Sequence, residues 1–121
     1  MRVEPMRIPV FVSCPTDLSP AQEDSAEIVL DLLDKNKLAW RALGRSDYSY
    51  KTPLTEVLGM VSRCSGGVIL GFSQFEAPSG VYKPNSANPR PVNQPVQMAT
   101  PWNQLEAGII FSHGLPILVF K

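Results

Sequence analysis

A glutamate lies on the apolar side of a helix that the sequence predicts near the end of the chain. The stretch TPWNQLEAG covers residues 100–108. Positions i, i+3, i+4 and i+7 of a helix share a face, so one stripe carries Trp102, Leu105, Glu106 and Ile109. A carboxylate is costly to bury unless another group pairs with it or uses it. Glu106 is therefore either a functional carboxylate or a residue at the border of the stripe that reaches water.

Further polar candidates lie where apolar runs end. Ser13 and Asp17 follow the run that begins IPVFV, and Ser73 follows GGVILGF. Ser13 and Asp17 can bind a ribose or a phosphate, helped by the positive end of the helix that comes next. The alternative interpretation is that these side chains only form a turn and cap that helix.

Three aromatic side chains could form the wall of a pocket. Trp102 can stack on a base or a nicotinamide ring, and the start of its helix is equally suited to a core anchor. Phe72 and Phe75 flank Ser73 at the end of a strand, where an aromatic ring can also line a pocket. Core packing is the favoured interpretation for Phe72. For Phe75, core packing and pocket lining both remain open.

The composition excludes several classes of protein. Eleven basic and eleven acidic residues cancel, which argues against a nucleic-acid binder or a polybasic membrane anchor. No apolar run approaches the roughly 18 residues of a membrane span. Two cysteines and one histidine make neither a disulfide scaffold nor a zinc site, so no metal is expected. MRVEPMRIPV lacks the apolar core of a secretory signal, and the cytoplasm is the expected compartment.

Four apolar runs predict strands at 8–14, 38–43, 66–72 and 115–121. A capping residue followed by proline predicts the start of each of three helices, at Ser19-Pro20, Thr52-Pro53 and Thr100-Pro101. Residues 74–101 hold six of the twelve prolines and no periodicity, and they are interpreted as one long loop insertion. The predicted order of elements along the chain is β-α-β-α-β-loop-α-β.

This alternation predicts a single α/β domain over residues 1–121. Right-handed crossovers then give a parallel sheet of order 2-1-3-4 with helices on both faces. Ligands of such sheets bind beyond the carboxyl ends of the strands. That edge gathers Ser13, Asp17, Phe72 and Ser73, and Glu106 can face the same crevice.

In this order the elements resemble a Toll/interleukin-1 receptor (TIR) domain of the bacterial type. IPVFVSC is similar to the first strand of the family, and GRSDYSYKTPLTEVLGMVSRC to its variable loop and second helix. GGVILGFSQF resembles the third strand, and WNQLEAGIIFSHGLPILVF resembles a W-x-x-x-E helix followed by glycine and an apolar strand. The resemblance implies a three-layer, flavodoxin-like fold. More distantly, LEAGIIFSHGLPI is similar to the nucleoside 2-deoxyribosyltransferases, which also act on N-glycosidic bonds.

The resemblance implies an NAD glycohydrolase that cleaves the nicotinamide–ribose bond, with NAD as substrate and no separate cofactor. Glu106 would be the essential carboxylate, since this cleavage builds positive charge on the sugar. Asp47 and Tyr48 lie in the loop that borders the site in TIR relatives. Two alternatives remain open: a non-catalytic TIR-type interaction module, and an N-glycosidase or transferase of nucleosides or nucleotides.

The resemblance also bears on assembly. TIR-like proteins associate with their own kind, so a homo-oligomer or a complex with other TIR-like domains is expected. The chain ends after the family's fourth strand, whereas the family usually continues with another strand and helix. The expectation is that these residues are the N-terminal part of a longer protein, or that another chain completes the sheet.

Overall fold

The computed structural model describes residues 6–42 and 53–121. Four parallel strands form the main sheet in the order β2-β1-β3-β8, which confirms the predicted order 2-1-3-4 with β8 as the fourth strand. Their bounds are β1 Ile8–Ser13, β2 Leu38–Arg41, β3 Gly67–Leu70 and β8 Ile117–Phe120. In the register, Val12 lies opposite Val68, which lies opposite Leu118 in turn.

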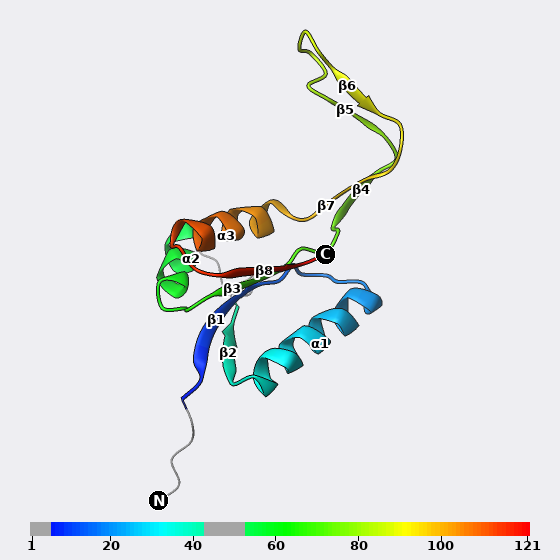
Figure 1. Cartoon of the computed structure of the whole chain (residues 1–121). Coiled ribbons are helices and arrows are strands. Elements are labelled where there is room, and N and C mark those ends of the chain that lie inside the picture. The colour runs from blue at the N-terminus through cyan, green and yellow to red at the C-terminus, as the bar shows by residue number, and fades with distance from the viewer. Residues whose placement is uncertain (1–5, 43–52) are drawn as a thin grey trace, which may run out of the picture.

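Three helices cover the two faces of this sheet (Figure 1). They are α1 Pro20–Lys35, α2 Pro53–Val61 and α3 Pro101–Ser112. Successive side chains of a strand point to opposite faces, so β1 contributes to both cores. Val10 and Val12 join the cluster on the α1 side, and Phe11 joins the cluster beneath α2 and α3. The expected three-layer α/β architecture is confirmed.

The helices begin where the sequence predicted, because their caps are local. The Ser19 hydroxyl accepts a hydrogen bond from the Gln22 backbone N–H at 3.2 Å, and the Gln22 side chain accepts one from the Ser19 N–H at 3.1 Å. This reciprocal capping box starts α1. Thr100 caps α3 with its hydroxyl alone, which accepts a hydrogen bond from the Asn103 backbone N–H, and Gly114 follows that helix with a φ of 69°. The predicted cap Thr52 lies outside the described residues.

The buried face of α3 is rotated relative to the predicted stripe, and the buried face of α2 is narrower than predicted. In α3, the fully buried side chains are Asn103, Glu106 and Ile110, whereas Leu105 is 42% exposed. For α2, helical spacing predicts a stripe of Leu54, Val57, Leu58 and Val61, of which Val57 and Val61 are buried and Leu54 and Leu58 are exposed. Helical periodicity predicts which residues share a face, but packing against the sheet decides which face turns inward.

Helix α3 lies very close to strand β3. A Cβ placed on Gly67 would come within 2.4 Å of Ile110 Cδ1, which is closer than real Cβ contacts allow. Gly67 therefore leaves the space into which the Ile110 side chain packs. Ile110 is completely buried and joins Phe11, Val57 and Ile69 in the core on this side.

The segment between β3 and α3 corrects the prediction of an irregular loop over 74–101. It forms a long hairpin of two antiparallel ladders, in which β4 (Phe75–Ala77) pairs with β7 (Val96–Met98) and β5 (Gly80–Tyr82) pairs with β6 (Arg90–Val92). Figure 1 shows this hairpin projecting away from the sheet. We call residues 75–98 the arm. Its strands have three residues each and lie mostly in solvent, so no alternation of buried and exposed residues marks them in the sequence.

Candidate functional site

Three buried polar side chains meet at the carboxyl end of β1. Ser13 is the last residue of that strand, and Asn103 and Glu106 lie one turn apart on α3. Each of the three is only 1% exposed. The Ser13 hydroxyl donates a hydrogen bond to Glu106 Oε1 at 2.7 Å, and the Asn103 amide donates one to Ser13 Oγ at 2.8 Å. The structure thus brings together two of the predicted site residues, Ser13 and Glu106.

A chain of side-chain hydrogen bonds runs from Thr100 through Asn103 and Ser13 to the Glu106 carboxylate. Thr100 Oγ1 donates to Asn103 Oδ1 at 3.1 Å and accepts from the Asn103 backbone N–H at the same distance. This fixes the amide so that its nitrogen faces Ser13, where it lies 3.4 Å from the backbone oxygen as well. Having accepted from Asn103, the Ser13 hydroxyl is oriented to donate to Glu106. The distance of 2.7 Å is typical of a well-formed O–H···O hydrogen bond.

The burial of Glu106 corrects one of the two sequence interpretations. A residue at the border of the stripe would reach water, but Glu106 is more deeply buried than its apolar neighbour Leu105. Buried polar groups are retained where hydrogen bonds satisfy them, and Ser13 supplies one such bond here. Glu106 is therefore an integral part of the contact between β1 and α3.

Sequence reasoning missed Asn103. It lies three residues before Glu106, and this spacing places the two side chains on one face of a helix. The predicted stripe passed through Trp102 and Leu105 instead, because those side chains are apolar. The pair Asn103 and Glu106 at i, i+3 was the available signal.

The remaining predicted site residues lie in different environments. Asp17 and Ser73 line a polar surface cleft of about 510 Å³, together with Gln22 and Gln74. Asp17 has a left-handed backbone with a φ of 54°, which suits the turn between β1 and α1. Gln22 donates to the Ser73 backbone oxygen at 3.0 Å and so ties α1 to the segment after β3. Ser13 and Glu106 are not among the residues that line this cleft.

Phe72 is 7% exposed and packs in the core on the α1 side, as its favoured interpretation predicted. Trp102 is half-buried in the first turn of α3. Asp47 and Tyr48 lie outside the described residues. Phe75 is exposed at the base of the arm.

Cys64 is a buried thiol in the core on the α2 and α3 side of the sheet. Burial raises the pKa of the Cys64 thiol, and the positive charge of Arg41 partly opposes this shift. Cys64 is a buried part of the core beneath α2 and α3, where a raised pKa makes it a poor nucleophile. In residues 6–42 and 53–121, no three histidine, cysteine or acidic side chains lie close enough to hold a metal ion. None of the helices described has the length and apolar character that crossing a membrane requires.

Comparison with protein-family models, with curated proteins and with solved structures finds no match to the chain. The arrangement of its own residues therefore carries the functional argument.

Proposed function

We propose that the chain is a TIR-like NAD glycohydrolase in which Glu106 is the essential carboxylate. The observation that carries this proposal is the placement of Glu106. It is a buried acidic side chain beside the carboxyl end of a parallel strand, and it accepts a hydrogen bond from the last residue of that strand. Ligands of parallel α/β sheets bind beyond this edge.

In the proposed reaction, the bond between the nicotinamide nitrogen and the ribose C1′ breaks, and its electron pair leaves with the nicotinamide. Positive charge develops on the sugar, and the Glu106 carboxylate stabilises it. A water molecule forms the new bond to C1′ and loses a proton to solvent, which gives nicotinamide and ADP-ribose. The leaving group is cationic before the bond breaks and neutral afterwards, so it departs without being protonated.

The hydrogen-bonded residues behind Glu106 have a positioning role in this proposal. Thr100 orients Asn103, Asn103 orients the Ser13 hydroxyl, and Ser13 holds one oxygen of the carboxylate. A carboxylate held in this way needs little rearrangement when charge develops beside it. Because Glu106 is only 1% exposed, NAD must displace part of the cover over it, and we expect binding to rearrange the neighbouring residues.

The test compares the rate of nicotinamide release from NAD for the wild type, Glu106→Gln and Glu56→Gln. Glu106→Gln keeps the shape of the side chain and removes its charge, and we expect the rate to fall about 10²–10³-fold. Glu56→Gln is the matched control, since Glu56 lies on α2 outside the buried group, and it should keep the wild-type rate. Thermal melting of each variant checks that the fold is intact.

A non-catalytic TIR-type interaction module is the second candidate. It is favoured by the arm, which projects away from the sheet and exposes apolar side chains. In that case Ser13, Asn103 and Glu106 only join β1 to α3. A Glu106→Gln variant that releases nicotinamide at the wild-type rate would refute the catalytic role and leave this candidate in the lead. Cleavage of nucleosides but not of NAD would instead favour a nucleoside N-glycosidase.

A further inference from the structure

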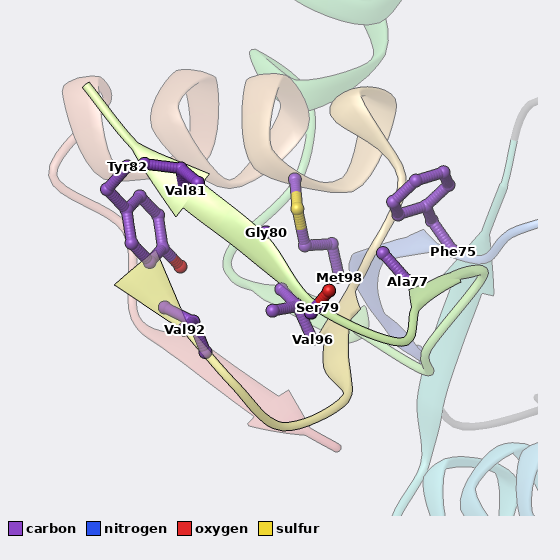
Figure 2. Close-up of a pocket in the computed structure, with 9 residues that line it drawn as sticks. All are labelled: Phe75, Ala77, Ser79, Gly80, Val81, Tyr82, Val92, Val96 and Met98. Atoms are coloured by element: carbon purple, nitrogen blue, oxygen red, sulfur yellow. The ribbon is translucent and has the colours of Figure 1, made fainter. Parts of the chain in front are cut away.

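The arm carries an apolar cup on its surface. The cup lies where the two ladders of the hairpin join, and it has a volume of about 190 Å³. Figure 2 shows the rings of Tyr82 and Phe75 toward its two ends, with Met98 and Val96 between them. A cavity of about 150 Å³ lined by apolar side chains accepts a benzene molecule. The cup is therefore large enough for one branched or aromatic side chain.

A complementary apolar surface lies on the outer face of α1. Ile28 is 61% exposed and Leu32 is 50% exposed, although both are large aliphatic side chains. They are four residues apart, which places them side by side on one face of the helix. Because α1 buries Ala26, Val29 and Leu33 against the sheet, this outer pair is left facing away from the core. An aliphatic side chain at either position fits the size and apolar character of the cup.

The charges of the two surfaces are opposite. Helix α1 carries five carboxylates and one lysine, within a chain whose net charge is zero. Asp24 and Asp31 lie at i−4 and i+3 from Ile28 and therefore flank it. On the arm, Lys83 and Arg90 lie next to and opposite Tyr82, at the distal end of the cup. Opposite charges beside a fitting apolar contact favour association and set its orientation.

The arm cannot make this contact with the helix of its own chain. Figure 1 shows the arm rising away from the sheet, while α1 covers the opposite face of the sheet. We propose that the arm binds helix α1 of a second copy of this chain, with Ile28 and Leu32 of that copy at the cup and its acidic residues facing Lys83 and Arg90. This contact is independent of the proposed activity, because it uses none of the residues around Glu106.

Two variants test the contact from its two sides. The arm variant carries Val81→Ser and Tyr82→Ser, and the helix variant carries Ile28→Ser and Leu32→Ser. All four side chains are at least half exposed, so these changes leave the core intact. In sedimentation velocity over a range of concentrations, the wild type should self-associate. Each variant should raise the dissociation constant about tenfold or more.

Mixing the variants gives the decisive result. The arm variant keeps an intact α1 and the helix variant keeps an intact arm, so an equimolar mixture regains one arm-to-helix contact and should form a heterodimer. Phe111→Ser is the control, because Phe111 is 76% exposed on α3 but lies outside the proposed contact. It should associate as the wild type does. A wild type that stays monomeric at every concentration, or a mixture that associates no better than its components, would overturn the proposal.

A charge exchange tests the orientation of the contact. The variant with Lys83→Glu and Arg90→Glu should lose self-association, and so should the variant with Asp24→Lys and Asp31→Lys. Mixed together, they place opposite charges across both possible arm-to-helix contacts, and association should return. It should weaken as salt is added, since exposed charges are screened at the ionic strength of ordinary buffers. A dissociation constant that neither pair of substitutions changes would contradict this arrangement.

Discussion

The α/β body and the arm place their polar and apolar side chains in opposite ways. In the body, the polar group of Ser13, Asn103 and Glu106 is almost completely buried, and its members hydrogen-bond to one another. In the arm, Phe75 and Tyr82 are each more than half exposed. Polar groups are buried at low cost only where hydrogen bonds satisfy them, and apolar patches left in solvent often mark contact surfaces.

This difference separates two kinds of task in one short chain. The body fixes a carboxylate within a rigid framework, as the proposed chemistry requires. The arm adds little to the core and presents a surface that another molecule can use. Substitutions of the same type in the two regions should therefore differ in their effect on stability, and three such pairs test the comparison.

The largest difference is expected from apolar side chains. Ile110→Ala removes a fully buried side chain and should lower the free energy of unfolding by about 2–5 kcal/mol. Val81→Ala in the arm should change it by less than about 0.5 kcal/mol. Urea denaturation at low protein concentration measures both values. If the two substitutions lowered the free energy of unfolding equally, the arm would be part of the cooperatively folding core.

Serine hydroxyls provide the second pair. Ser13→Ala removes the hydrogen bond to Glu106 and leaves the Asn103 amide without its acceptor hydroxyl, which should cost about 1.5–3 kcal/mol. Ser86→Ala removes two exposed hydrogen bonds, one donated to the Lys83 backbone oxygen and one accepted from the Asn88 backbone N–H, and should cost less than about 0.5 kcal/mol. The same denaturation experiment applies. A Ser13→Ala variant with the wild-type free energy of unfolding would mean that the buried polar group adds nothing to stability.

Glycines give the third pair, which isolates steric fit. Gly67→Ala forces Ile110 to move and should cost about 1–3 kcal/mol, whereas Gly80→Ala in the arm meets open space and should be nearly neutral. Ile110→Val removes the atom that a Cβ on Gly67 approaches most closely. Combining it with Gly67→Ala should therefore cost less than the sum of the two single changes. Strict additivity would contradict the close approach of α3 to β3.

The parts of the fold that sequence reasoning predicted are those with local signals. The starts of α1 and α3 follow from Ser19 and Thr100, because a capping residue and its N3 partner are three residues apart. The sheet order follows from alternating elements and the handedness of their crossovers. The arm gave no such signal. Phe75 pairs with Met98, far along the chain, and strands of three residues facing water need no apolar alternation.

The candidate site was predicted in part for the same reason. Glu106 stood out because its acidic side chain interrupts an apolar stripe, and Ser13 because it ends a buried strand. Asn103 escaped notice because its importance comes from its position beneath Ser13, a residue 90 positions away. Periodicity also placed Leu105 inward, although the structure leaves it exposed.

The sequence by itself determined the helix starts, the parallel order of the strands and the presence of a carboxylate on a helix that packs on the sheet. The helix starts depend on capping residues three positions from their partners, and the strand order depends on the alternation of strands and helices along the chain and on the handedness of the crossovers. The tertiary structure alone decided which face of α3 turns inward and which polar groups share a buried hydrogen-bonded chain. It also decided that a proline-rich segment forms a hairpin with an apolar cup. Each of these depends on residues distant in sequence, and only the packing of α3 against β1 and β3 and the pairing of the arm's strands bring them together.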